Sequence, residues 1–186
     1  MKPQKPALAD NPFSYVVKVG HVSANPISVR LSADARELQG LARLWAVEEV
    51  TALNAELQIA RWKKDGIRIR GTVDADIVQA CIVTLEPVGS HIEEEIDQIF
   101  IPEGSKLARI TVENGEMVVD PDGPDLPELF TGDSIDVGTV VAEFAALAID
   151  PYPRKPDTDF KDHIEDDGSA DTRPSAFSAL KDWKKE

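Results

Sequence analysis

The sequence has a single cysteine and three isolated histidines among its 186 residues. One cysteine cannot form an internal disulfide, and Cys81 lacks the neighbouring thiol and imidazole ligands of a structural zinc site. Aromatic residues make up only 6% of the chain, and no apolar run reaches the roughly 18 residues that span a bilayer. We therefore expect a cytoplasmic protein without membrane contact, metal or other cofactor.

Motifs that mark common enzyme classes are also missing. The chain has no Gly-x-x-x-x-Gly-Lys phosphate loop, no Gly-x-Gly-x-x-Gly fingerprint and no Gly-x-Ser-x-Gly elbow. The remaining catalytic hypothesis makes Cys81 a nucleophile and His91 its base, which requires the fold to bring them together. We expect instead that Cys81 is a small buried residue, and that the protein is not an enzyme and has no small-molecule substrate.

Acidic residues outnumber basic ones, and they are unevenly distributed. The formal net charge is −14, yet residues 1–90 carry 11 Lys or Arg against 10 Asp or Glu, whereas residues 91–136 carry 2 against 13. An acidic protein repels nucleic acid at long range, so any RNA contact has to come from a local basic surface. Alternatively, the acidic segment receives a basic protein, or the charge only keeps the protein soluble.

Composition sets a central region apart from two polar ends. Residues 1–12 contain three prolines and few apolar groups, so we expect a flexible N-terminus. Residues 151–186 are rich in proline and then in acidic residues, which predicts a disordered tail. An exception is the stripe Phe177, Leu180 and Trp183, whose spacing is typical of one side of a short terminal helix. This stripe either docks on its own domain or binds a groove of a partner.

Residues 13–150 are predicted to form a single α+β domain. Apolar spacing indicates a helix over 33–46 with Ser32 as its N-cap, and a helix over 134–149 capped by Asp133 or Ser134. Strand patterns occur at 15–19, 27–31, 53–59, 67–77 and 92–101. We expect a mostly antiparallel, curved sheet or a partly open barrel, packed by these two main helices.

The strands on either side of Lys64-Asp65-Gly66 form the clearest hairpin. Odd-numbered apolar residues occupy both strands, and a three-residue loop over 64–66 places both sets on one side of the sheet. This loop pairs Lys63 with Ile67, sets Trp62 opposite Arg68, and gives Gly66 a left-handed backbone.

The opposite side of this hairpin then carries a basic and aromatic patch, which consists of Trp62, Lys64, Arg68 and Arg70. Such a patch is suited to stack a base and to neutralise phosphates, so it is the candidate RNA-binding surface. The alternative is a solvated face on which Trp62 and Arg68 simply pair across the strands.

Three motifs together are similar to a known family. Their order along the chain is Cys81-Ile-Val-Thr-Leu-Glu-Pro-Val88, then Leu147-Ala-Ile-Asp-Pro-Tyr-Pro-Arg154, then Pro174-Ser-Ala-Phe-Ser-Ala-Leu-Lys181. They resemble the YceD family, the large ribosomal RNA subunit accumulation proteins, over about residues 14–184. The motif residues of the first block are Cys81, Leu85, Glu86 and Pro87.

The resemblance implies a non-enzymatic role in the synthesis, processing or stability of large-subunit ribosomal RNA. The implied partners are pre-ribosomal RNA, a basic large-subunit ribosomal protein, or both. The alternative is an adaptor that binds a basic protein without touching RNA. Many family members have a second cysteine where this chain has Thr84, so the first block is predicted to be a structural turn here.

Overall fold

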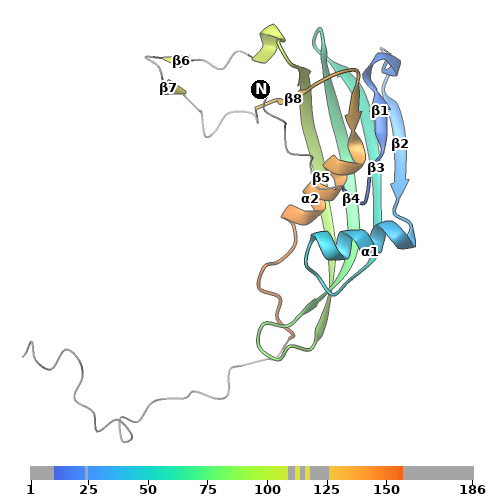
Figure 1. Ribbon diagram of the computed structural model, residues 1–186, viewed down its shortest axis with the longest axis vertical. Helices are drawn as coiled ribbons and strands as arrows, with labels where there is room; N and C mark the ends of the chain where they lie inside the picture. Colours follow the sequence, from blue (N-terminus) through green and yellow to red (C-terminus); the bar gives the residue numbers. More distant parts are fainter. Residues whose placement is uncertain (1–10, 24, 109–111, 114–115, 118–125, 157–186) are drawn as a thin grey trace, which may run out of the picture. The chain divides into compact units, whose positions relative to one another are not determined.

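The computed structural model describes residues 11–23, 25–108, 112–113, 116–117 and 126–156. Its main element is a five-stranded sheet in the order β2-β3-β4-β5-β8, which does not close into a barrel within these residues (Figure 1). The strands are β2 Ile27–Ser32, β3 Glu49–Trp62, β4 Gly66–Ala80, β5 Pro87–Pro102 and β8 Glu128–Phe130. Neighbouring strands are antiparallel except β5 and β8, which run parallel.

Both helices pack on the same face of this sheet. Helix α1, Ala35–Leu44, contacts β3, and helix α2, Val137–Leu147, contacts β4 and β5 (Figure 1). The remaining elements are short: β1 Val16–Lys18 pairs with β9 Ser134–Asp136, β6 Val112–Glu113 pairs with β7 Glu116–Met117, and two 3-10 turns are η1 Val19–His21 and η2 Lys106–Ala108. The expected α+β class, with a mostly antiparallel sheet and two helices, is confirmed.

The hydrophobic core lies between the helices and the odd-numbered side chains of β3 and β4. Leu57, Ile59, Ile69 and Val73 are among the most deeply buried of these side chains, and Val141 of α2 belongs to the same core. Val50 also lies in the core, because the register shifts between Val50 and Ala52. From Asn54 on in β3, and from Arg68 to Asp76 in β4, the even-numbered side chains point to the other side. That side, here called the open face, is not covered by either described helix.

Helix α1 begins later than the sequence pattern predicts. Asp34, not Ser32, is its N-cap: the Asp34 carboxylate accepts from the backbone N–H groups of Arg36 and Glu37 at 2.8 Å, and Glu37 accepts from the Asp34 N–H. Ser32 is the last residue of β2, and its hydroxyl donates to the Asn54 side chain. The reciprocal bonds of a capping box favour the position with Glu three residues later.

Helix α2 is capped by Asp136, so the predicted caps Asp133 and Ser134 are wrong. The Asp136 carboxylate accepts from the N–H of Gly138 at 3.0 Å and from the N–H of Tyr15 at 2.8 Å. Ser134 instead begins β9, which pairs with β1, so the helix begins only at Val137. One carboxylate therefore caps the helix and also holds the N-terminal strand.

The hairpin loop has three residues, but they are 63–65 and not 64–66. Trp62 pairs with Gly66, and Lys63 has the left-handed backbone, with φ of 52°. Gly66 is required for another reason: a Cβ there would lie 2.8 Å from the Trp62 ring. Because the shift changes the register by two, both apolar sets still share one face.

The shifted register changes the pairs on the open face. Arg68 lies opposite Ala60, and Arg70 lies opposite Gln58. The predicted opposition of Trp62 and Arg68 is therefore wrong, and these two residues are diagonal neighbours.

Some predictions concern residues outside the described ranges. These include the stripe Phe177, Leu180 and Trp183, residues 1–10 of the N-terminus and residues 157–186 of the tail. Within the described part of the chain, neither helix has the length and apolar character needed to cross a bilayer.

Candidate nucleic-acid interface

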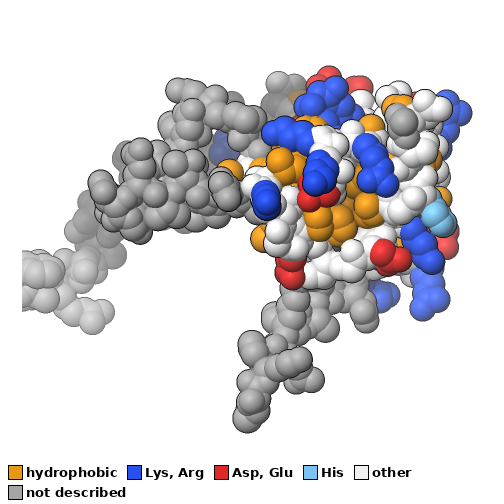
Figure 2. Space-filling model, turned by 90° about the horizontal axis from the view of Figure 1, so that it is seen from above, with side chains coloured by type: hydrophobic (Ala, Val, Ile, Leu, Met, Phe, Trp, Pro, Cys, Tyr) orange, Lys and Arg blue, Asp and Glu red, His pale blue; other side chains and the backbone are white. Residues whose placement is uncertain are grey.

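Charges on the open face are separated by sign along the strands. The hairpin end, defined as loop 63–65 with the adjoining ends of β3 and β4, carries Lys63, Lys64, Arg68 and Arg70 against one carboxylate, Asp65. Figure 2 looks onto this end and shows Lys and Arg side chains gathered around hydrophobic ones. The predicted basic residues Lys64, Arg68 and Arg70 are thus placed together on one end of the sheet.

The other end of the open face is acidic. Asp74 and Asp76 of β4 pair with Glu93 and His91 of β5, and Glu95 follows opposite Thr72. An RNA backbone would be attracted to the hairpin end and repelled from this acidic end.

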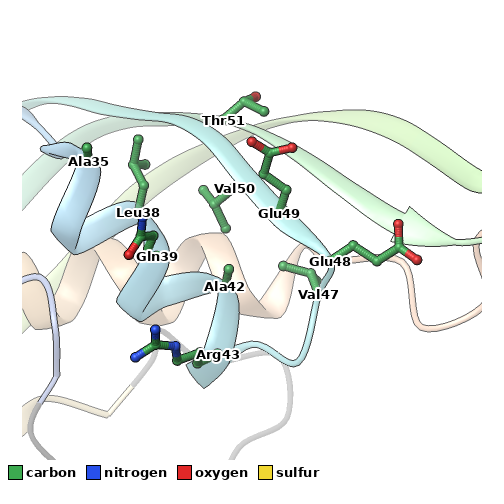
Figure 3. A pocket seen from close by; sticks show the side chains of 10 residues that line it. All are labelled: Ala35, Leu38, Gln39, Ala42, Arg43, Val47, Glu48, Glu49, Val50 and Thr51. Carbon is green, nitrogen blue, oxygen red and sulfur yellow. The ribbon is translucent and has the colours of Figure 1, made fainter.

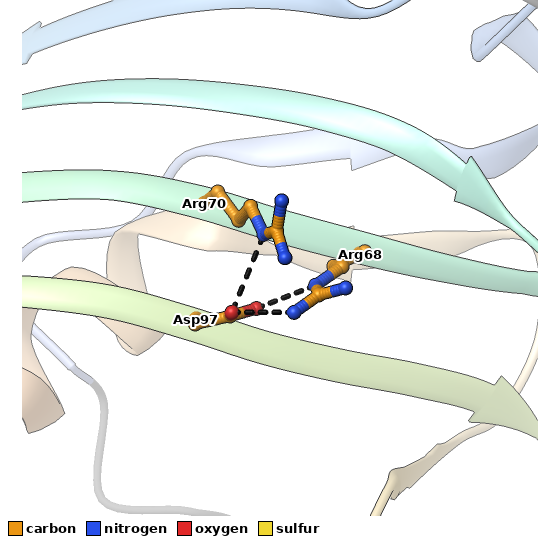
Figure 4. A network of polar contacts seen from close by, with 3 residues as sticks. All are labelled: Arg68, Arg70 and Asp97. Carbon is orange, nitrogen blue, oxygen red and sulfur yellow. Dashed lines mark hydrogen bonds and ion pairs between the residues drawn. The ribbon is translucent and has the colours of Figure 1, made fainter.

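Two arginines of the hairpin end converge on one carboxylate, Asp97 of β5 (Figure 4). Arg68 donates through Nε and Nη2 at 2.6 and 2.5 Å, and Arg70 donates through Nε at 3.3 Å. The hydrogen bonds from Arg68 lower the pKa of Asp97, and the same contact raises the pKa of Arg68. Two cations and one anion leave a local excess of one positive charge.

Trp62 is half-buried at the end of β3, and its ring already has a cation beside it. The Lys63 ammonium lies 4.1 Å from the ring centroid, within the range of a cation–π contact. The Lys63 ammonium thus occupies one face of the Trp62 ring. The sequence pattern did not single out Lys63, because only the register shows that it belongs to the loop.

A groove on the helix side of the sheet has a different character. It has a volume of about 460 Å³ and lies between α1 and the start of β3 (Figure 3). Leu38, Ala42 and Val50 line it, with the carboxylates of Glu48 and Glu49 at its edge. Arg43 is the one cation among the lining residues, against these two carboxylates, so the groove suits a nucleic-acid backbone less well than the hairpin end does.

The first family motif forms the turn between β4 and β5. Cys81 N–H donates to the Glu86 carbonyl at 2.8 Å, and Leu85 N–H donates to the Cys81 carbonyl at 2.9 Å. Leu85 has a left-handed backbone, with φ of 60°, and its side chain is 76% exposed. Pro87 is the first residue of β5. The motif thus has the geometry of a tight structural turn.

This turn holds the segment that follows α2, so two of the three motifs lie in contact. Ile82 N–H donates to the Pro153 carbonyl at 3.0 Å, and Lys155 Nζ donates to the Glu86 carboxylate at 2.7 Å. The backbone N–H of Lys155 points to Cys81 Sγ at 3.5 Å. We call this arrangement the 81–86/150–155 clamp.

The Cys81 thiol is fully buried inside the clamp. The pKa of Cys81 is lowered to about 6. The largest cause is a hydrogen bond with the Thr84 side chain, and the second is the hydrogen bond from the Lys155 backbone N–H; burial acts in the opposite direction. Thr84, three residues after Cys81 in the first motif, therefore contacts the thiol directly.

The structure does not bring Cys81 and His91 together. His91 lies exposed on the open face, where its Nδ1 is 2.8 Å from the Asp76 carboxylate. Since Cys81 is enclosed by the clamp, His91 is not positioned as its base. Among the described residues, no group of three or more His, Cys, Asp or Glu side chains is arranged to hold a metal ion.

Comparison with known proteins gives one result that bears on function. The model of the YceD family, described as large ribosomal RNA subunit accumulation protein YceD, matches residues 69–184. Searches among curated proteins and among solved structures each gave no match.

Proposed function

Because the chain belongs to the YceD family, we propose that it supports the accumulation of large-subunit ribosomal RNA by binding that RNA in the cytoplasm, without catalysing a reaction. The observation that carries the proposal is the separation of charge on the uncovered sheet face. Basic side chains at the hairpin end give an acidic protein one local surface that attracts phosphates.

The acidic end of the open face contributes to this function because it limits where the RNA can lie. An RNA strand that lies across Lys63, Lys64 and Arg68 meets Glu93 and Glu95 if it continues along β5. Like charges there disfavour further contact, so the RNA is confined to the hairpin end. Bound RNA is then protected over a short stretch, which is consistent with a role in its stability.

A second candidate function is favoured by the acidic end itself. Asp76, Glu93 and Glu95 are all exposed and lie on adjacent strands. A basic extension of a ribosomal protein fits this surface, and the protein then acts as an adaptor without RNA contact.

The test compares two double variants that remove equal charge. Arg68→Ala with Arg70→Ala changes the hairpin end, whereas Arg36→Ala with Arg43→Ala changes exposed positions of α1. Binding to large-subunit ribosomal RNA fragments is followed by fluorescence anisotropy between 50 and 200 mM salt, with circular dichroism as the folding control. Binding through phosphate contacts weakens measurably over this range of salt concentration.

We expect the hairpin-end variant to bind RNA more weakly and to reduce the slope of log K against log salt by up to roughly 1.4, the value for two single-strand phosphate contacts. The α1 variant should bind like the wild type. Equal binding by both variants would contradict the RNA proposal. The adaptor function would be supported instead by two results together. The wild type would bind no RNA, and changing Glu93 and Glu95 to Gln would abolish its capture of a ribosomal protein.

A further inference from the structure

We infer that a hollow next to Arg70 holds one unpaired nucleotide of the bound RNA; this inference rests on the proposed function and names the part of the RNA that the site selects. The hollow has a volume of about 400 Å³ and lies over β2, β3 and β4 on the open face. The even-numbered side chains that line it are Ser28, Arg30, Glu56, Gln58, Arg70 and Thr72.

The shape of the hollow follows from the sequence of the three strands. Ser28 and Thr72 are short, whereas Arg30, Glu56, Gln58 and Arg70 are longer and form the walls around them. Beneath them β3 and β4 approach closely, because Gly71 has no side chain where a Cβ would lie 1.9 Å from the Glu56 carbonyl oxygen. The floor is therefore backbone, and its shape does not depend on flexible side chains.

The walls offer neutral hydrogen-bonding groups that the described part of the protein leaves unused. The side chains of Ser28, Gln58 and Thr72 are exposed and have no hydrogen-bond partner among the described residues. A hydroxyl and an amide can each donate and accept, which matches the polar edges of a base and the ribose hydroxyls. A ligand that binds here replaces water and breaks no bond made by these three groups.

Charge at the hollow favours an anionic ligand. Arg70 uses only Nε in its 3.3 Å contact with Asp97, so its remaining N–H donors can bind a phosphate. Arg30 is on the opposite side and pairs with Glu56 at 3.0 Å, but both side chains are mostly exposed and their pairing is weakened by solvent.

The surroundings indicate a nucleotide within an RNA strand and not a free nucleotide. Gln58 and Trp62 are on the same face of β3, four residues or about 13 Å apart at the usual rise of a strand. An extended strand can thus place one nucleotide in the hollow and continue past Arg68 to Trp62 and the loop lysines. An unpaired base is favoured over a paired one, because only the unpaired base has its Watson–Crick edge free for the hydroxyl and amide groups of the walls.

The test uses the full chain and a fluorescein-labelled single-stranded oligoribonucleotide, with the same sequence as a duplex for comparison. Thr72→Leu fills the hollow without adding a ring, and Gln58→Ala removes one hydrogen-bonding wall. Asn54→Ala is the control, because Asn54 is an amide on the same strand and face but outside the hollow. Since Asn54 also bonds with Ser32 and Asp74, circular dichroism checks that this variant is folded. Amide chemical shifts of Gly71 and Thr72 report directly on occupancy, and adenosine and uridine monophosphates serve as competitors.

We expect Thr72→Leu to weaken single-strand binding at least tenfold and Gln58→Ala about fivefold, the loss expected for one hydrogen bond. Asn54→Ala should stay within twofold, and the duplex should bind more weakly than the single strand. The inference is overturned if Thr72→Leu binds like the wild type, or if millimolar monophosphates saturate the Gly71 and Thr72 shifts while RNA leaves them unchanged. If the wild type binds no RNA at all, the proposed function itself fails.

Discussion

Replacing Gly71 by Ala tests the tight contact between β3 and β4 that forms the floor of the hollow. The new Cβ would lie 1.9 Å from the Glu56 carbonyl oxygen and 2.9 Å from the Leu57 Cα. Because both neighbours are backbone, no side chain can rotate away. The two strands have to separate by about 1 Å before the contact becomes sterically allowed.

The expected loss of stability follows from this separation. It breaks or weakens about two ladder hydrogen bonds, each contributing roughly 0.5–1.5 kcal/mol. It also forces the core side chains of the central hairpin to repack, which costs about 1–3 kcal/mol. We therefore expect Gly71→Ala to lower the free energy of unfolding by roughly 2–6 kcal/mol, a large part of the usual total of about 5–15 kcal/mol.

Gly89→Ala is the control for this experiment. Gly89 is in β5 of the same sheet, has no positive φ, and a Cβ there meets nothing within 4 Å. The change should be neutral or stabilising by about 0.5 kcal/mol, because alanine restricts the unfolded chain. Urea unfolding of both variants measures the free energies. A Gly71→Ala protein within about 1 kcal/mol of the wild type, at an unchanged m-value, would refute the steric argument.

Two further predictions concern titratable groups. The hydrogen bond with Asp76 raises the pKa of His91. The pair therefore stabilises the fold below the unfolded pKa of about 6.5, and this stabilisation is lost as pH rises through the higher folded pKa. An NMR titration of the His91 ring should show the raised pKa, and Asp76→Asn should lower the pKa of His91. Burial should make Cys81 react slowly with iodoacetamide in the folded protein despite its pKa of about 6, and quickly after denaturation; fast labelling of the native protein would show that the clamp opens.

The sequence predicts the sheet well because its apolar alternation has a simple physical consequence. Odd-numbered residues of β3 and β4 have to share a face, and they do. The same alternation cannot distinguish registers that differ by two residues, so loop 63–65 was placed one residue too late. Contact between Gly66 and the Trp62 ring decides between them, and no periodic pattern contains that information.

The candidate site was predictable in part for a similar reason. Lys64, Arg68 and Arg70 follow from the hairpin alone, since cross-strand neighbours are close in sequence. Asp97 does not, because its position opposite Arg70 depends on the register between β4 and β5. That register is set by the turn over 81–86, whose geometry has no periodic signature.

The 81–86/150–155 clamp also has a consequence for the order in which the chain folds. Its two halves are far apart in sequence, because Lys155 follows Cys81 by 74 positions. At the usual pace of translation, about 5–20 residues per second, the second half leaves the ribosome roughly 4–15 s after the first. During that interval the nascent sheet has its β3–β4 hairpin, but the turn at the other end of β4 lacks the 150–155 segment, so the clamp forms only after α2 has been synthesised.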